Sequence, residues 1–103
     1  MHCILFYQVV EGFTEKRTSF RGAHLKKVQE AHQAGHLVLA GALADPADGA
    51  VLVFHGPDPR VAEDFAQSDP YVTEKLVKSW TVRKWMTVVG EGATPPELSD
   101  PKK

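Results

Sequence analysis

The sequence predicts an α+β fold in which one sheet of four antiparallel strands carries two helices on a single face. Two observations lead to this prediction. Short segments rich in β-branched and aromatic residues alternate with segments of helical periodicity, in the order β-α-β-β-α-β. Right-handed crossovers place both helices of such a chain on the same side of the sheet, which is the ferredoxin-like arrangement.

The first two elements are a strand over 2–10 and a helix over 14–34. The stretch HCILFYQVV is short, β-branched and aromatic, which is typical of a strand. In the segment after it, apolar residues recur at helical spacing on one face. Thr14 is the expected N-cap of this helix, and Gly35 is expected to end it.

A hairpin and a second helix follow. Strands are predicted over 36–43 and 50–55, because the turn ADPADG between them is rich in Asp, Pro and Gly. The second helix is predicted over 59–68, with Asp58 as its N-cap and a proline at its first position. Pro70 disfavours helical geometry in the residue before it, so the helix should end ahead of this proline.

The last strand is predicted over 79–89, SWTVRKWMTVV, and residues 71–78 before it fit one more helical turn. Beyond this strand the chain is polar, contains three prolines and lacks periodicity, which predicts a flexible tail over 90–103. Residues 1–89 are therefore expected to form a single domain.

Composition excludes several classes of function. Hydrophobic residues make up 43% of the 103 residues and charged residues 24%, and the net charge of −1 comes without the basic stripe of a nucleic-acid-binding domain. No apolar run approaches the roughly 20 residues that a membrane span requires. Cys3 is the only cysteine, so no intramolecular disulfide is possible. The start of the chain does not resemble a signal peptide, and we expect a cytoplasmic protein.

Both faces of the predicted sheet are apolar. Cys3 and Leu5 of the first strand point to one face, and Ile4 and Phe6 point to the other. Residues 50–54 are apolar on both sides. Because two helices cover only one face, a second copy of the chain packed sheet against sheet is the simplest cover for the other. We therefore expect a homodimer.

His24 lies at the centre of the apolar face of the first helix, between Phe20 and Val28, with Arg17 and Arg21 toward one edge. Burying an imidazole is unfavourable unless its nitrogens find partners. One interpretation is a structural histidine that bonds to a backbone carbonyl. The other is a titratable group that takes part in chemistry.

Asp69 is the expected partner of His24. It closes the second helix on the face toward the sheet, and Pro70 holds it extended, so its side chain can project from the helix axis. Since both helices share one face of the sheet, the two side chains can approach each other. A carboxylate on one ring nitrogen sets the tautomer and leaves the other nitrogen to exchange a proton. The alternative role of Asp69 is that of a turn residue before proline.

Two further residues are candidates for binding a small-molecule substrate. Arg21 precedes His24 by three residues on the same face, and its guanidinium can hold a carboxylate or a phenolate. A salt bridge, or a side chain that lies along the surface, is the alternative role of Arg21. Tyr71 either belongs to the core or lines the same pocket.

No cofactor is expected. His32 and His36 have a spacing that suits a metal on one helix face, but Gly35 separates them and no third ligand is near, so we predict no metal. The sequence also contains no glycine-rich phosphate loop and no nucleophile elbow.

Several short motifs together resemble the YciI family over about residues 2–88. They are, in order, RGAHL at 21–25, AGHL at 34–37, AG at 40–41, DG at 48–49, DPY at 69–71 and VRKW at 82–85. The resemblance implies a dimeric α+β barrel of ferredoxin-like protomers, with a pocket near His24 and Asp69 as a catalytic dyad. It also implies chemistry such as dehydrochlorination of chlorinated hydroxyquinols, and muconolactone isomerases use the related fold.

These observations predict a small enzyme that carries out an elimination or an isomerisation on a small cyclic or aromatic acid. His24 is the expected general acid or base, Asp69 orients it, Arg21 binds the anionic part of the substrate and Tyr71 lines the pocket. The alternative is a non-catalytic module that binds a metabolite, with His24 and Asp69 as a structural pair. A monooxygenase of the related barrel fold is a third interpretation.

Overall fold

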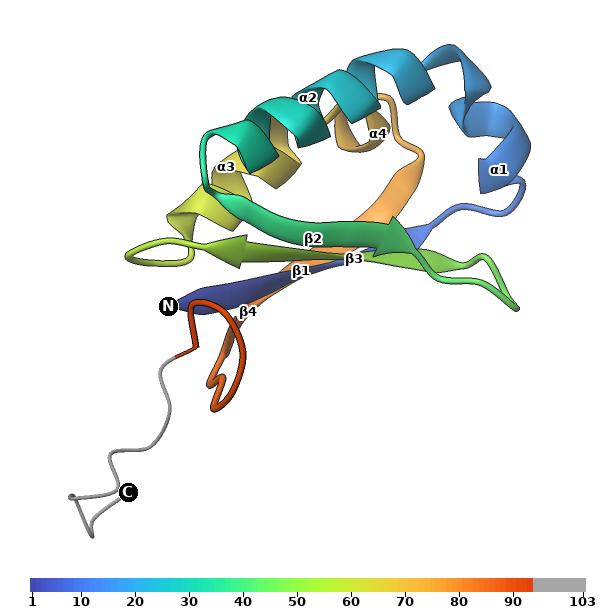
Figure 1. Ribbon diagram of the computed structural model, residues 1–103. Helices are drawn as coiled ribbons and strands as arrows, with labels where there is room; N and C mark the ends of the chain where they lie inside the picture. Colours follow the sequence, from blue (N-terminus) through green and yellow to red (C-terminus); the bar gives the residue numbers. More distant parts are fainter. Residues whose placement is uncertain (94–103) are drawn as a thin grey trace, which may run out of the picture.

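The computed structural model describes residues 1–93 and has the predicted α+β architecture. One antiparallel sheet has the strand order β2-β3-β1-β4, and the helices lie together on one of its faces (Figure 1). The elements are β1 (His2–Val9), α1 (Phe13–Lys16), η1 (Arg17–Ser19), α2 (Arg21–Gln33), β2 (Leu37–Ala42), β3 (Gly49–His55), α3 (Arg60–Ser68), α4 (Pro70–Thr73) and β4 (Val77–Trp85). Within this part of the chain, no helix combines the length and apolar character needed to cross a membrane.

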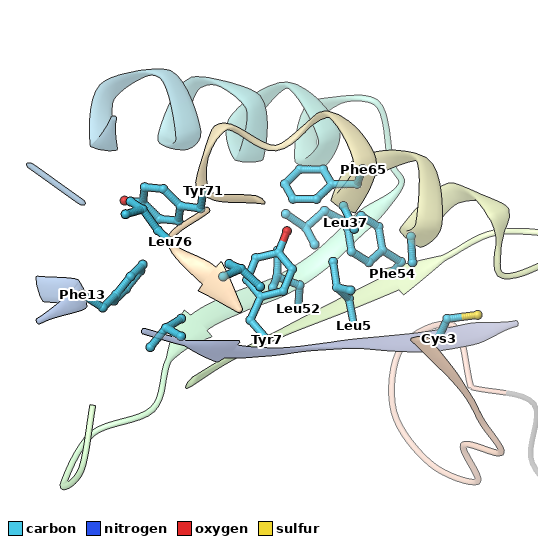
Figure 2. Packing of buried hydrophobic residues seen from close by; sticks show 14 residues of the cluster. Cys3, Leu5, Tyr7, Phe13, Leu37, Leu52, Phe54, Phe65, Tyr71 and Leu76 are labelled. Atoms are coloured by element: carbon cyan, nitrogen blue, oxygen red, sulfur yellow. The ribbon is translucent and has the colours of Figure 1, made fainter. Parts of the chain in front are cut away.

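The hydrophobic core lies between the sheet and the helices, and β1 runs through its centre. Alternate residues of β1 face the helices, and Leu5 and Tyr7 are buried there. Leu52 and Phe54 of the neighbouring β3 join them, and Phe65 of α3 packs against this layer (Figure 2). Tyr7 therefore brings a hydroxyl group into the space beneath the helices.

The first predicted helix is divided into three parts, so the prediction of one helix over 14–34 is wrong. Gly12, with φ 76°, precedes α1, and no side chain caps the helix, so Thr14 is not its N-cap. At Phe20 the backbone has φ −112° and ψ −3°, which separates η1 from α2. Because the chain bends there, Phe13 stays buried beside the sheet while α2 crosses above it (Figure 1). A straight helix cannot follow that path.

Smaller differences concern the ends of the other elements. Helix α3 begins at Arg60, one residue later than predicted, so Pro59 is its N-cap and the prediction of Asp58 as N-cap is wrong. Asp58 still accepts the N–H of Arg60 at 2.8 Å. The helical turn predicted within 71–78 corresponds to the short helix α4, which begins one residue earlier, at Pro70. Strand β4 then starts at Val77, two residues earlier than predicted, and Leu76 next to it is also buried.

The last strand is also shorter at its far end than the prediction of 79–89. It stops at Trp85, although Met86 and Val88 continue the apolar pattern. Both side chains are largely exposed, and Met86 is 74% accessible. The pattern at the end of this segment therefore does not mark a buried strand face.

The segment 86–93 turns back toward the start of β1. Thr87 Oγ1 lies 2.9 Å from Nδ1 of His2, and Gly92 lies against the ring of the same histidine. Four residues of the tail predicted over 90–103 thus belong to this folded-back segment. The rest of that prediction, 94–103, lies outside the described residues.

The outer face of the sheet carries no helix of residues 1–93 and is partly apolar. Phe6 of β1 is 39% exposed and Leu39 of β2 is 72% exposed. Ile4, Val51 and Val53 occupy neighbouring positions on the same face and are half-buried. The homodimer expected to cover this face stays a prediction.

Candidate functional site

His24 and Asp69 meet beneath the helices. His24 lies in the first turn of α2, and Asp69 lies at the junction of α3 and α4. Nδ1 of His24 is 2.8 Å from Oδ1 of Asp69, although the two residues are 45 positions apart in the chain. The side chain of Asp69 is fully buried, whereas that of His24 is 14% exposed. The structure thus brings the predicted pair into direct contact.

The backbone at Asp69 explains why its carboxylate points inward. With φ −69° and ψ 127° the residue is extended, because Pro70 disfavours the helical region before it. The carboxylate then caps the short helix α4, since Oδ1 accepts the N–H of Tyr71 at 3.1 Å. Asp69 is therefore both a turn residue before proline and the partner of His24.

Tyr7 supplies a further donor to this carboxylate, which the sequence analysis missed. Its hydroxyl donates to Oδ2 of Asp69 at 2.7 Å. Figure 2 shows this hydroxyl directed from β1 toward the helices. Burial first, and then the charge of Asp69, raise the pKa of Tyr7 far above its ordinary value, so the phenol keeps its proton. The alternation of β1 places Tyr7 on the inner face, but no sequence signal identifies its hydrogen-bond partner.

The donors around Asp69 determine which nitrogen of His24 carries the proton. A buried carboxylate is tolerated where hydrogen bonds replace its lost hydration, and an ionised carboxylate can only accept them. Nδ1 of His24 must therefore donate to Asp69. Nε2 is left with the lone pair in the neutral ring and with a proton in the charged ring. The Nδ1 partner is a carboxylate rather than the backbone carbonyl of the alternative interpretation.

Tyr71 fixes the plane of the imidazole. Its ring is stacked on that of His24, with centroids 3.8 Å apart and an angle of 11° between the planes. Phe13 meets Tyr71 edge-on, with centroids 5.2 Å apart. Aromatic contacts of both kinds are favourable beyond the area that they bury. Tyr71 is thus a core residue that also shapes the surroundings of His24, so its two predicted roles coincide.

A cavity of about 230 Å³ lies beside His24. Its apolar lining comes from Phe13, Leu25, Val28, Ala40, Gly41, Ala42, Ala50 and Leu52. Its polar lining consists of Tyr7, Arg17, Arg21, His24 and Tyr71. Sites for drug-sized ligands usually measure about 300–1,000 Å³, so this cavity suits a smaller molecule.

Two arginines stand at one end of the cavity. Arg21 is exposed, and Arg17 is half-buried, with its Cζ 5.5 Å from the centre of the Phe13 ring. Within residues 1–93 neither guanidinium forms an ion pair with a carboxylate. The salt bridge considered for Arg21 is therefore not observed there. No role was predicted for Arg17, although it precedes Arg21 by four residues and lies toward the same edge of the predicted helix. In the structure the two arginines belong to different elements, η1 and α2, and still line the same cavity.

His32 and His36 do not come together as a pair of ligands. His32 Nδ1 lies 2.9 Å from the backbone oxygen of Leu37, so this nitrogen donates to the start of β2. Gly35, with φ 82°, follows the end of α2 and redirects the chain before His36. The contact of His32 therefore ties α2 to the sheet.

Comparison with known proteins adds two findings. The sequence profile of the YCII-related domain matches residues 1–86. A solved structure of 5-chloro-2-hydroxyhydroquinone dehydrochlorinase (TftG) from Burkholderia phenoliruptrix AC1100, in complex with 2,5-dihydroxybenzoquinone, superposes with a TM-score of 0.71. The superposition covers 91% of this chain and 100% of that chain at 16% identity, so it shows a shared fold. No curated protein matches the sequence.

Proposed function

The chain belongs to the YCII-related domain family, and on that premise we propose that it is a small enzyme in which His24 and Asp69 perform acid–base chemistry. The substrate is a small cyclic or aromatic acid, and the reaction is an elimination or an isomerisation. One observation carries the proposal. The buried carboxylate of Asp69 bonds to Nδ1 of His24, whose ring lines a cavity.

Nε2 of His24 is the base of the reaction. It accepts a proton from the substrate, and the imidazolium that forms is stabilised by the Asp69 carboxylate. In a dehydrochlorination of a chlorinated hydroxyquinol, the ring carbon that carries chlorine first gains a proton, which gives a keto tautomer. Nε2 then removes a hydroxyl proton from this tautomer, and the electron pair left behind forms a carbonyl, shifts a ring double bond and expels chloride from that carbon. In an isomerisation, Nε2 returns the proton to a different atom of the substrate. General acid–base assistance of this kind accelerates a reaction by about 10²–10⁴-fold.

The similar structure supports the proposed substrate class. That protein is a dehydrochlorinase, and its ligand, 2,5-dihydroxybenzoquinone, is a single ring with acidic hydroxyl groups. The cavity of the present chain is small, mostly apolar and bordered by two arginines. Such a lining suits the body of one ring together with a negatively charged substituent.

Chloride release from 5-chloro-2-hydroxyhydroquinone tests the enzyme proposal. His24→Gln keeps a polar side chain but removes the base, so we expect the rate to fall by about 10²-fold or more. The matched control is His36→Gln, at an exposed histidine outside the cavity, which should act at the wild-type rate. A folded His24→Gln chain that releases chloride as fast as wild type would contradict the proposal.

A non-catalytic metabolite-binding module is the second candidate function. This candidate is favoured by the hydrogen bonds of Asp69, which caps α4 and accepts the O–H of Tyr7. Both bonds stabilise the fold whether or not the protein catalyses a reaction. In that case wild-type protein would turn over neither the chlorinated hydroxyquinol nor a muconolactone. NMR titration would still show changes in the chemical shifts of the His24 ring as a small aromatic acid binds.

We also propose that the protein forms a homodimer through the outer face of the sheet. The exposed side chains of Phe6 and Leu39 support this, since a contiguous apolar face favours association. Sedimentation velocity at micromolar concentration should give a dimer for wild type and a monomer for Leu39→Lys. Gln29→Lys, at an exposed position of α2, is the matched control and should stay dimeric. A monomeric wild-type protein would contradict this proposal.

A further inference from the structure

The two tyrosines beneath the helices differ in how their hydroxyl groups are satisfied. Tyr7 donates to Asp69, whereas the buried hydroxyl of Tyr71 has no hydrogen-bond partner among the described residues. Figure 2 shows the oxygen of Tyr71 pointing away from Tyr7. Buried polar groups are nearly always paired, so an unpaired hydroxyl beside a cavity indicates a missing partner.

Two positively charged side chains, Arg17 and Arg21, line the cavity together with Tyr71. Burial raises the pKa of Tyr71, the charges of Arg17 and then Arg21 oppose that rise, and the charge of Asp69 adds to it. No hydrogen bond reaches this hydroxyl from Arg21 or from any other described residue. Because burial is the largest effect, the hydroxyl stays protonated and can donate.

No carboxylate of the described residues faces this positive charge from the lining of the cavity, and Asp69 lies behind Tyr7 and His24. Among the described residues that line the cavity, two are arginines and none is aspartate or glutamate. Helix α2 starts at the same end with no acidic residue in its first turn and no capping side chain. Its dipole therefore adds to the positive potential there.

We propose that the Tyr71 hydroxyl, Arg17 and Arg21 form a subsite for one anionic oxygen of the substrate, a phenolate or a carboxylate. The subsite rests on the proposed function, because the same cavity presents the ring of that substrate to His24. Tyr71 donates its O–H and the guanidiniums donate N–H groups to the anion. Arg17 and the Tyr71 hydroxyl thus become determinants of specificity, which select ionised ring acids over neutral analogues.

Calorimetric titration of the full chain at neutral pH tests the subsite with three probes. They are 2,5-dihydroxybenzoquinone as a phenolate-type anion, benzoate as a carboxylate, and 2,5-dimethoxybenzoquinone as a neutral ring. We expect wild-type protein to bind at least one of the two anions about 10-fold more tightly than the neutral ring. Which anion binds more tightly identifies the oxygen that the subsite recognises.

Arg17→Gln and Tyr71→Phe should each weaken the binding of that anion by about 5–20-fold, as expected for the loss of one charge-assisted hydrogen bond. Neither change should alter binding of 2,5-dimethoxybenzoquinone. Lys26→Gln removes an exposed positive charge of α2 outside the cavity and should bind like wild type. Tyr71→Phe loses only an unpartnered hydroxyl, so thermal melting should show a folded chain.

Equal weakening of the neutral and anionic probes would overturn the subsite, because it would indicate general damage to the cavity. Wild-type protein that binds neither anion at millimolar concentration would also overturn it. His24→Gln separates the two proposals. If His24→Gln keeps wild-type turnover while Arg17→Gln loses anion binding, the subsite stands and the proposed role of His24 falls.

Discussion

Two histidines of this chain lie on opposite faces of the same sheet, and their surroundings differ. His24 is on the helix side, where it bonds to a carboxylate and lines a cavity. His2 is on the outer side, where it is only 4% exposed. Its Nδ1 bonds to the hydroxyl of Thr87. Its ring packs edge-on against the rings of His55 and Trp85, with centroids 5.1 and 6.3 Å away, respectively.

The two histidines differ in the charge of the group to which Nδ1 bonds, a hydroxyl for His2 and a carboxylate for His24. The pKa of His2 is lowered, first by burial and then by the positive charges of His55 and the N-terminus. Its hydroxyl partner offers no negative charge to offset a proton. His24 instead bonds to the carboxylate of Asp69 and lines the cavity.

Removal of the carboxylate should have the largest effect. Asp69→Ala leaves the donors of Tyr7, His24 and the Tyr71 backbone without their acceptor in a buried place. We expect the free energy of unfolding to fall by about 3–5 kcal/mol, measured by urea denaturation. Thr87→Val removes the partner of His2 and should lower it by only about 1 kcal/mol. Similar losses in the free energy of unfolding for Asp69→Ala and Thr87→Val would show that the two sites do not differ in their contribution to stability.

Replacement of the two buried tyrosines should have smaller effects on stability than Asp69→Ala, and these effects should differ between Tyr7 and Tyr71. Tyr7→Phe deletes a hydrogen bond to a charged group, so we expect the free energy of unfolding to fall by about 1.5–3 kcal/mol. Tyr71→Phe deletes an unpartnered hydroxyl and should change stability by less than about 0.5 kcal/mol. Urea denaturation of both variants measures the difference. A Tyr71→Phe chain as unstable as Tyr7→Phe would mean that the Tyr71 hydroxyl is already bonded in the free protein.

The pH dependence contributed by His2 should be the smallest effect. Because its pKa in the folded protein is lowered from the ordinary 6.5, the unfolded chain binds more protons as the pH falls through this value. Its contribution to stability is therefore present above pH 6.5 and is lost in acid. We expect His2→Gln to lose less stability than wild type between pH 8 and pH 5.5 in denaturant titrations. Identical losses of stability for wild type and His2→Gln would show that the pKa of His2 is the same in the folded and unfolded chain.

Sequence patterns predicted the parts of the fold that depend on alternation and on proline. The buried side chains of Cys3, Leu5 and Tyr7 follow the period of two that marks the inner face of β1. The approach of Asp69 to His24 follows from two helices on one face and from the extended geometry imposed before Pro70. These features depend on neighbouring residues or on the order of the elements along the chain, so they can be predicted from a single sequence.

Other features depend on contacts that no local pattern encodes. Helical periodicity continues through Phe20, yet the chain bends there so that Phe13 can pack beside the sheet. The apolar pattern of β4 continues through Met86, although the strand has ended. The hydrogen bond from Tyr7 to Asp69 joins residues 62 positions apart and appears only when the strand and the helices are in place.

In the proposed enzyme, Asp69 holds a proton on Nδ1 of His24 and leaves Nε2 free toward the substrate. Long-range ¹H–¹⁵N NMR spectra at alkaline pH, where the ring is neutral, report the tautomer of each histidine directly. We expect a protonated Nδ1 and an unprotonated Nε2 for His24, with loss of this preference in Asp69→Asn. A His24 ring with its proton on Nε2 would contradict the proposed role of Asp69.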